Sequence, residues 1–339
     1  MPLPTTAREV RLTSTPDSLP TAAHFTVAET PLPAPGPDRV LVRNTHFLVF
    51  PGLRTLIGGE VDGVPLPPIR AGQALFGPAL GEVLAAPADG PLRPGDLVTH
   101  LHGWRDHALG AAADFTPVDG SLPDPVAHLS PASAGYGALT RSAGLRRGDT
   151  VLITGAAGAV GTVAGQTARL LGASRVIGTT GSPGKAKRLV AELGYDVVLV
   201  RGAGPIADQL AEAAPDGIDV LLDTVGGEQL TAAVDAARPG ARFALVGALS
   251  GQMAPGGRGG SSPAVVDSFR LLALGVSVRG FRGLDHPDLE TEWRHRFGAW
   301  LRAGEISFPR TVVAGIDRAP GALTRLIEGD GFGAMIVEL

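Results

Sequence analysis

Three glycines spaced three residues apart lie near the middle of the chain, at Gly155, Gly158 and Gly161. They follow the apolar run VLIT and precede a stretch with apolar residues at helical spacing, which predicts a strand, a glycine turn and a helix. The first glycine lets the chain turn sharply, the second admits a pyrophosphate to the backbone, and the third lets the helix pack on the strand. The N-terminus of the helix adds free N–H groups and a positive dipole end. The spacing therefore predicts a dinucleotide-binding turn, with a purely structural glycine turn as the alternative.

The segment TTGSPGKAKR, residues 179–188, contains Lys185 and Lys187, the only two lysines in the chain. In an NAD site, an acid about 20 residues after the glycines accepts a hydrogen bond from the ribose 2′-hydroxyl. Residues 178–182 stand at that place and include no acid, so a 2′-phosphate would meet no repulsion. A charge-assisted contact from Lys185 is worth about 1.5–3 kcal/mol, or about ten- to a hundredfold in affinity. We expect NADPH as the cofactor, with Lys187 solvated; the alternative is that both lysines are solvated.

These motifs need a framework of strands and helices to position them. From about residue 150, apolar strands alternate with helical stretches, which predicts βαβ units and a doubly wound parallel sheet of the Rossmann type. The first 125 or so residues instead contain short β-type runs between Pro- and Gly-rich turns, typical of a twisted, partly closed antiparallel sheet. The Gly- and Ser-rich stretch 250–264 predicts a mobile loop, which is either a lid or simply disordered.

Composition excludes several classes of protein. A chain of 339 residues with 44% hydrophobic and 18% charged residues fits two globular domains. Its net charge of −4 argues against nucleic acid as a partner. No apolar run is long enough for a membrane span and the N-terminal residues lack a signal-peptide core, so we expect no membrane partner and a cytoplasmic location. The absence of cysteine excludes disulfides and cysteine-ligated metals.

Longer stretches resemble the medium-chain dehydrogenase/reductase superfamily. The resemblance is to its zinc-independent, quinone oxidoreductase-like branch of prostaglandin/leukotriene reductases and alkenal double-bond reductases. AAGAVGTVAGQTARLLG is similar to that branch's nucleotide turn, GTTGSPGK to its phosphate turn, and LLDTVGGEQL to its DNVGG strand end. LVRNTHFLVFPGLR, AWLRAGEI and DRAPGALTRLIEGDGFGAMIV are similar to further family segments, so the resemblance covers nearly the whole chain.

The resemblance implies a fold and an activity. It implies a GroES-like, partly closed β-barrel catalytic domain formed by residues 1–125 and 299–339, with a Rossmann NADPH-binding domain inserted at 126–298. It also implies NADPH-dependent reduction of a C=C bond conjugated to a carbonyl, in a homodimer. No metal is expected, because the GHE segment of zinc relatives is replaced here by FGPALGEV.

The resemblance also carries cofactor contacts over, residue by residue. Arg201 takes the place of a family tyrosine and could bind the 2′-phosphate through two N–H groups. Asp223 belongs to the matched strand end that passes near the nicotinamide ribose. The residues expected to bind the cofactor are Gly158, Ala159, Val160 and Gly161 at the pyrophosphate; Thr180, Gly181, Ser182, Lys185 and Arg201 at the adenosine end; and Thr224, Val225, Val246, Gly247, Ser250 and Phe281 at the nicotinamide end.

Several positions depart from the family pattern. Gly52 and Phe50 replace a tyrosine and an aspartate, and Gln252 replaces the tyrosine of another loop. Residues 331–334 read GFGA where the family has N-x-G-K, so one polar contact to the cofactor is expected to be lost. The missing hydroxyl is one that the family often uses to stabilise an enolate. We therefore expect a pocket rebuilt for another substrate, such as a polyketide or other secondary metabolite, or an impaired enzyme.

Candidate proton donors are scarce. His46 lies in the segment that lines the active site of the family, and His107 and Tyr136 match positions near the cleft, so these three are the catalytic candidates. The alternatives are satisfied or surface histidines and a packing role for the tyrosine. Arg54 is expected either to shape the cofactor side of the cleft or to form a surface salt bridge.

Two other groups of residues are assigned no chemistry. Tyr195 is expected to be structural because it follows the second Rossmann helix. His100, His102 and His107 have a spacing that matches no usual ligand set, so we expect a strand leading into a loop there rather than a metal site.

Three functions compete on this basis. The leading one is an NADPH-dependent enoyl or enone reductase that transfers a hydride to the β-carbon of an α,β-unsaturated carbonyl. A close alternative is an NADPH:quinone oxidoreductase, because a quinone is also a conjugated acceptor. From another class comes a non-catalytic NADPH-binding protein, which turnover of an enone would exclude.

Overall fold

The computed structural model describes residues 2–256 and 258–339. The chain divides into a first unit, Met1–Leu129 with Arg310–Gly331 and Met335–Leu339, and a second unit, Ser130–Pro309 with Phe332–Ala334. The predicted domain boundaries at 125/126 and 298/299 lie within about a dozen residues of these divisions and stay a prediction. Among the described residues, no helix is long and apolar enough to cross a membrane.

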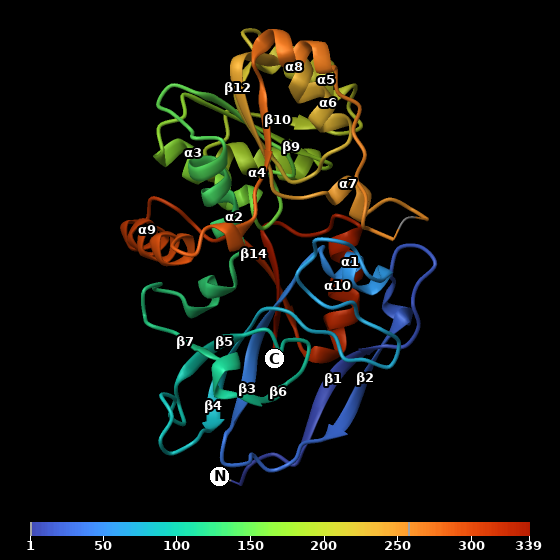
Figure 1. Ribbon diagram of the computed structural model, residues 1–339, viewed down its shortest axis with the longest axis vertical. Coiled ribbons are helices and arrows are strands. Elements are labelled where there is room, and N and C mark those ends of the chain that lie inside the picture. Colours follow the sequence, from blue (N-terminus) through green and yellow to red (C-terminus); the bar gives the residue numbers. More distant parts are fainter. Residues whose placement is uncertain (1, 257) are drawn as a thin grey trace. The chain divides into compact units, whose positions relative to one another are not determined.

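The first unit is built on antiparallel strands (Figure 1). One sheet has seven strands in the order β14-β15-β3-β4-β5-β7, with β6 paired to β3, and β1 and β2 form a separate antiparallel pair. The expectation of an antiparallel domain is therefore confirmed. The elements are β1 Thr6–Leu12, β2 Phe25–Pro31, β3 Arg39–Val49, α1 Leu53–Gly58, β4 Ala79–Ala85, β5 Leu97–His100, β6 His107–Ala111, β7 Thr116–Pro117, β14 Arg310–Ala314, α10 Ala319–Ile327 and β15 Ala334–Glu338.

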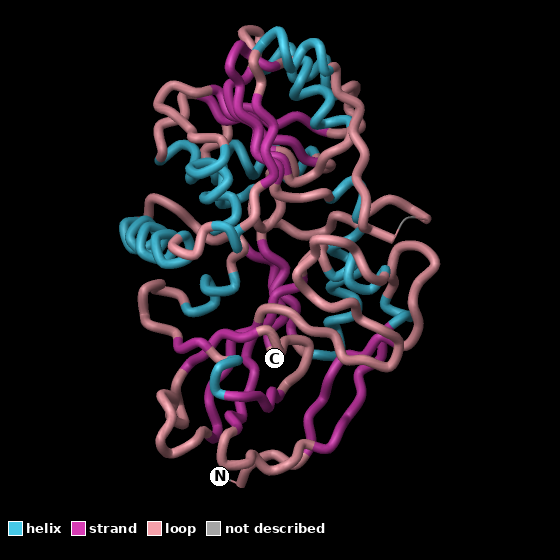
Figure 2. Tube along the Cα trace, in the orientation of Figure 1, coloured by secondary structure: helices cyan, strands magenta, loops and turns pink. Residues whose placement is uncertain are grey.

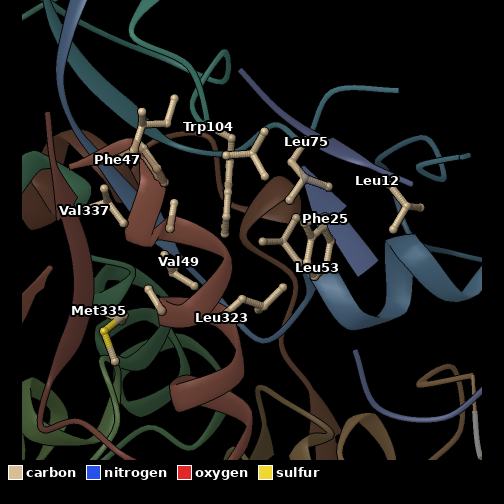
Figure 3. Close-up of a cluster of buried hydrophobic side chains, with 14 of the residues drawn as sticks. Leu12, Phe25, Phe47, Val49, Leu53, Leu75, Trp104, Leu323, Met335 and Val337 are labelled. Carbon is tan, nitrogen blue, oxygen red and sulfur yellow. The ribbon is translucent and has the colours of Figure 1, made fainter. Parts of the chain in front are cut away.

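The core of the first unit joins segments from both ends of the chain. Phe47 and Val49 of β3 pack with Leu323 of α10 and with Met335 and Val337 of β15 (Figure 3). On β3, residues 47 and 49 alternate with neighbours on the other face, as expected for a strand with one face on a core. The C-terminal residues therefore complete the same hydrophobic core as the N-terminal strands.

The second unit contains a six-stranded sheet in the order β10-β9-β8-β11-β12-β13, and every pair in it is parallel. This is the strand order of a Rossmann fold, so the predicted fold class is confirmed. The strands are β8 Thr150–Ile153, β9 Arg175–Thr180, β10 Val197–Val200, β11 Ile218–Asp223, β12 Ala237–Leu245 and β13 Ser277–Gly280. The helices are α2 Ala132–Gly137, α3 Gly161–Leu170, α4 Pro183–Leu193, α5 Ile206–Ala213, α6 Glu228–Asp235, α7 Leu249–Gln252, α8 Ser268–Leu274 and α9 Leu289–Ala303.

Helices cover both faces of this sheet (Figure 1). Val151 and Ile153 of β8 pack on the side of α3 and α4, whereas Leu152 faces the side of α5 and α6. Strands buried on both faces must be apolar at consecutive positions, which explains the runs VLI in β8 and VLL in β11. The carboxyl ends of the strands are left as the edge where a ligand can bind.

The sequence did not predict α8 or β13, which are short and mostly exposed. The predicted loop 250–264 begins within α7 and then continues without helix or strand (Figure 2). Residue 257 of that loop lies outside the described residues. Ser250 and Ser262 share a hydrogen bond of 2.7 Å between their hydroxyl oxygens, so the two ends of the loop meet.

Candidate cofactor site and catalytic side chains

The glycine turn follows β8 directly. Gly155 has φ +62°, and a Cβ there would lie 2.5 Å from the Thr224 Oγ1. At Gly161 a Cβ would lie 2.6 Å from the Ala156 Cα, so α3 packs on the turn more closely than any side chain allows. Gly158 is exposed, and the nearest atom to its added Cβ is the Gly155 oxygen at 3.3 Å. Two glycines are thus required by the fold itself, whereas Gly158 leaves an open backbone at the N-terminus of a ten-residue helix.

A C-terminal segment lies beside this turn. The Gly333 N–H donates to the Ala157 oxygen at 2.9 Å, and Gly333 forms a β-bridge with Gly158. The Arg188 guanidinium of α4 covers the neighbouring Phe332 ring, 3.9 Å from its centroid. From the sequence, residues 331–334 are expected only to lose a polar contact to the cofactor. In the structure the backbone of this segment flanks the glycine turn. The pairing joins residues far apart in the sequence, so no local pattern could predict it.

The end of β9 leads into α4. The Ser182 hydroxyl accepts a hydrogen bond from the Lys185 N–H at 3.4 Å, and Pro183 occupies the first turn, so the local sequence begins the helix there. The Arg201 guanidinium lies beside Gly181, where an added Cβ would come within 3.1 Å of it. Lys187 is exposed, as expected. The structure therefore gathers Gly181, Ser182, Lys185 and Arg201 at one strand end that has no acid in residues 178–182.

A pair of side chains joins β8 and β11 where they end. The Thr154 hydroxyl donates to the Asp223 Oδ1 at 2.6 Å, and the same oxygen accepts from the N–H groups of Val225 and Gly226 at 2.9 Å. Thr224 returns two hydrogen bonds of 2.8 Å to Thr154. Asp223 is buried, so these bonds satisfy its Oδ1 away from water and fix the turn that carries Thr224 and Val225.

The turn after β12 is hydrogen-bonded to this one. The N–H groups of Val246 and Gly247 donate to the backbone carbonyl oxygen of Asp223 at 2.8 and 3.2 Å. The Ser250 N–H donates to the backbone carbonyl oxygen of Val225 at 2.9 Å. Thr224, Val225, Val246, Gly247 and Ser250 are therefore brought together at the carboxyl edge of the sheet.

Phe281 follows β13 and lies at the same edge, where its N–H donates to the Leu245 oxygen at 2.9 Å. Its ring stacks on His286 with 5.5 Å between centroids and packs against Gly137. A nicotinamide contact for Phe281 stays a prediction.

Thr179 on β9 makes two hydrogen bonds that the sequence does not predict. Its hydroxyl accepts from the Gly155 N–H at 3.1 Å and donates to the Gln229 Oε1 at 2.6 Å. Gln229 is the second residue of α6, 50 positions away, so no local sequence pattern could have indicated the pair.

The Tyr136 side chain makes its contacts with α9 of the second unit. Its hydroxyl donates to Glu292 of α9, and its ring packs on Trp293 at 5.3 Å between centroids. Burial, with help from the Glu292 hydrogen bond, raises the pKa of Tyr136 to about 12. These contacts favour the packing role over proton donation, which stays a prediction.

Tyr195 is buried, and its hydroxyl donates to the Gly161 oxygen at 2.7 Å. Its ring fills the space beside Gly165 and Gly178. The expected structural role of this tyrosine is confirmed.

The two histidine candidates lie in the first unit. His46 on β3 is partly buried, and its Nδ1 lies 3.0 Å from the Thr45 hydroxyl. Burial lowers the pKa of His46, partly opposed by Glu338, so the neutral imidazole is favoured near neutral pH. His107 begins β6, and its Nδ1 lies 2.9 Å from the Asp106 Oδ1. The two histidines therefore differ in their partners. His107 lies against a carboxylate, whereas the hydrogen-bond partner that the described residues give His46 is a hydroxyl.

Arg54 and Phe50 explain part of the departure from the family pattern. Arg54 in α1 is only 1% exposed, and burial lowers its pKa, so the alternative of a surface salt bridge is wrong. The Phe50 ring lies between two glycines: an added Cβ would approach it to 3.0 Å at Gly52 and 2.9 Å at Gly77. The ring thus fills the space that a side chain at position 52 would need.

His100 is buried against the Phe115 ring, 5.0 Å between centroids, and accepts from the His102 N–H at 3.0 Å. Burial, followed by the neighbouring His102 and Arg105, lowers its pKa to about 3. Across residues 2–256 and 258–339 no group of three His, Cys, Asp or Glu side chains could hold a metal ion.

Two family models match the chain. The model for the zinc-binding dehydrogenase matches residues 159–297, and the model for the N-terminal domain of oxidoreductase matches residues 8–118. The first begins within the glycine turn, at Ala159, and covers Gly161 together with the ends of β9, β11 and β12. The second covers β3 with His46 and α1 with Arg54.

Curated relatives match over nearly the full length. The putative NADP-dependent oxidoreductase YfmJ of Bacillus subtilis is 30% identical over 98% of this chain and 97% of its own length. The NADPH-dependent curcumin reductase of Escherichia coli is 26% identical over 97% and 95%. The 2-alkenal reductase (NADP(+)-dependent) of Nicotiana tabacum is 25% identical over 89% and 88%.

A solved structure also resembles the chain. The crystal structure of CurA from Vibrio vulnificus in complex with NADPH aligns with a TM-score of 0.87 at 27% identity, over 98% of both chains.

Proposed function

The chain belongs to the medium-chain dehydrogenase/reductase superfamily, among NADP-dependent oxidoreductases that include prostaglandin reductases and 2-alkenal reductases, and from this premise we propose that it reduces conjugated C=C bonds with NADPH. The substrate class is an α,β-unsaturated carbonyl compound. The observation that carries the proposal is the acid-free end of β9, where Ser182, Lys185 and Arg201 gather next to the glycine turn. That arrangement suits a 2′-phosphate and disfavours NADH.

The residues of the second unit fit the cofactor. The exposed Gly158 and the N-terminus of α3 offer backbone N–H groups to a pyrophosphate. Lys185 and Arg201 supply cationic donors for the 2′-phosphate. The rigid turn held by Thr154 and Asp223 supports the proposed contact of Thr224 and Val225 with the nicotinamide end. These groups bind and orient, so the barrier falls mainly through positioning.

NADPH held by these residues would supply the hydride, from C4 of its nicotinamide, that the β-carbon of the substrate accepts. The electron pair of the C=C bond then moves toward the carbonyl, and negative charge accumulates on the carbonyl oxygen. A hydrogen-bond donor aimed at that oxygen lowers the barrier, and a proton must finally reach the α-carbon. The net change is addition of one hydride and one proton, which leaves a saturated carbonyl compound and NADP⁺.

We propose His46 as the side chain that donates toward the carbonyl oxygen. A neutral imidazole keeps one N–H, and the lowered pKa of His46 favours that form at neutral pH. The lack of a hydroxyl at Gly52 and the buried hydroxyl of Tyr136 support this choice. His107 and Tyr136 remain the other candidates.

Turnover of a panel of substrates tests the function. NADPH consumption is followed with an enone, an alkenal and a quinone, and each reaction is repeated with NADH. The proposal expects consumption with the enone or alkenal, a saturated carbonyl product by mass spectrometry, and at least tenfold preference for NADPH. Turnover of the quinone alone would support the quinone oxidoreductase alternative instead. Binding of NADPH without any turnover would support a non-catalytic NADPH-binding protein.

Finer features are also proposed. A substrate other than a small alkenal, such as a polyketide or other secondary metabolite, is proposed because Gly52 lacks the hydroxyl of the family tyrosine. A cytoplasmic location follows from the sequence expectation alone. A homodimer is supported by β13, an edge strand of the six-stranded sheet, and by exposed apolar side chains nearby on α8.

A further inference from the structure

Gln229 is a buried glutamine with an unused donor. It is 5% exposed, and its only hydrogen bond with the described residues is the one that its Oε1 accepts from Thr179. The Nε2 amino group, which carries two donor hydrogens, has no acceptor in that part of the chain. Unlike the enclosed side-chain atoms of the chain that lack a partner, the Nε2 stays accessible, so it can donate to a molecule that binds there.

Two other glutamines of the second unit behave differently. The Gln166 Nε2 donates to the oxygens of Thr162 and Ser307 at 2.7 and 3.2 Å, and its Oε1 accepts from the Ser307 N–H at 2.8 Å. The Gln209 Nε2 donates to the Val200 oxygen at 3.1 Å, and its Oε1 accepts from the Val200 N–H at 2.9 Å. Both side chains are less buried than Gln229. In both, the Nε2 donates and the Oε1 accepts a hydrogen bond within the chain.

The hydrogen bonds of Thr179 fix the orientation of the Gln229 amide. The Thr179 oxygen already accepts from the Gly155 N–H, so its own hydrogen is directed to Gln229. That hydrogen needs an acceptor, which places the Oε1 toward Thr179 and the Nε2 away from it. Thr179 itself is 1% exposed, so water does not compete for this bond.

The location of the amide identifies the ligand chemistry. Thr179 lies at the carboxyl end of β9, three residues before Ser182, and Ile177 on the same face of the strand packs in the core on the α5 and α6 side. Gln229 therefore lies beside the proposed 2′-phosphate site, on the face of the sheet opposite α3. In NADPH the ribose with the 2′-phosphate carries the adenine, whose ring nitrogens accept hydrogen bonds.

We propose that the Nε2 of Gln229 donates a hydrogen bond to an acceptor atom of the adenosine half of NADPH. The Thr179 hydroxyl holds the amide in that orientation and also fixes the Gly155 N–H of the glycine turn. This pair thereby links the adenosine end of the site to the pyrophosphate turn. The inference rests on the proposed function, because it takes NADPH as the cofactor.

Calorimetric titration of the full chain with three probes tests the inference: NADPH, adenosine 2′,5′-bisphosphate and reduced nicotinamide mononucleotide. Gln229→Met removes the amide at similar length. We expect it to weaken NADPH and the bisphosphate about 5- to 30-fold, as for loss of one hydrogen bond, and to leave the mononucleotide unchanged. Gln166→Met is the matched control, because its amide is satisfied within the chain, and it should leave all three affinities unchanged.

Gln229→Glu is the second variant and keeps an acceptor for the Thr179 hydroxyl. It replaces the donor with a carboxylate near the 2′-phosphate, so it should weaken NADPH more than NADH, a difference that a merely structural role would not produce. If Gln229→Met does not fold, Gln229→Glu decides the matter. With an enone as substrate, the KM for NADPH should rise in step with the loss of affinity.

The outcomes separate this inference from the function on which it rests. Wild-type binding of NADPH with unchanged affinity of both Gln229 variants for the bisphosphate would overturn the inference and leave the function standing. An equal loss for the bisphosphate and the mononucleotide would also overturn it. If the wild-type chain fails to bind NADPH, the proposed function is wrong and the inference falls with it.

Discussion

Lys185 is the residue on which we expect the preference for NADPH over NADH to depend most. Its backbone N–H is held by the Ser182 cap at the first turn of α4, and its ammonium is expected at the 2′-phosphate. Replacement by alanine removes a charge-assisted contact of about 1.5–3 kcal/mol, so NADPH should bind about ten- to a hundredfold more weakly. Fluorescence titration with NADPH and NADH measures this, and the NADH affinity should not change.

Lys187→Ala is the matched control for that titration, because the exposed Lys187 is the only other lysine. It should keep the preference for NADPH. Equal loss in both variants would mean that net charge, rather than the position of Lys185, sets the preference.

His100 makes stability depend on pH. Its pKa in the folded protein is about 3, below the usual 6.5, so the unfolded chain binds a proton that the folded chain does not. This contribution to stability is present above pH 6.5 and falls by about 1.4 kcal/mol per pH unit below it, until the pH approaches 3. Between pH 7 and 5 the free energy of unfolding of His100→Gln should therefore fall by about 1–2 kcal/mol less than that of the wild type. Urea unfolding at the two pH values measures this difference.

His295→Gln is the control for this pH dependence, because His295 is an exposed histidine on α9. It should follow the wild-type pH profile. If His100→Gln also follows that profile, His100 takes up a proton in the folded chain as readily as in the unfolded chain, which would contradict its lowered pKa.

At the scale of elements, the glycine turn separates folding from binding. Gly161→Ala places a Cβ 2.6 Å from the backbone of Ala156, so α3 must move away from β8. We expect a loss of about 1–3 kcal/mol in the free energy of unfolding. Thermal unfolding measures it.

Gly158→Ala should act in the opposite way. Position 158 is exposed, and its added Cβ meets only the Gly155 oxygen, at 3.3 Å, so stability should change by no more than about 0.5 kcal/mol. The new methyl group occupies the surface that a pyrophosphate approaches, and the affinity for NADPH should fall at least about tenfold. Unchanged affinity in this variant would place the pyrophosphate elsewhere.

The sequence predicted these elements because each carries a local signal. The three glycines have fixed spacing between a strand and a helix, and Ser182 and Pro183 begin α4 by capping rules. The Gln229–Thr179 pair, the Gly333 bridge to the turn and the Phe50 ring between two glycines carry none. Each depends on residues that are brought together only by the tertiary fold. The short α8 and β13 were missed because a four-residue strand has too few residues to show periodicity.

At the scale of the whole molecule, β13 and α8 support the proposed homodimer. Phe269 and Leu272 on α8 are 74% and 77% exposed, and Val278 on β13 is 42% exposed. An unpaired edge strand next to apolar side chains is a surface that natural proteins usually cover. We expect Phe269→Asp with Leu272→Asp to convert a dimer to a monomer in light scattering, with the fold intact by circular dichroism.

Leu284→Asp is a matched control, because Leu284 is also 70% exposed but lies outside α8 and β13. It should leave the oligomeric state unchanged. A wild-type chain that is monomeric at micromolar concentration would contradict the dimer.

The fate of the transferred hydrogen tests the central claim most directly. The wild-type chain is incubated with an enone and NADPH that carries deuterium at nicotinamide C4 on the transferred face, and the product is examined by NMR. Reduction of a conjugated C=C bond predicts one deuterium on the β-carbon of a saturated carbonyl compound and a solvent-derived proton on the α-carbon. Deuterium on the carbonyl carbon, which would give an allylic alcohol, or an enone returned unchanged while NADPH remains bound, would contradict the account.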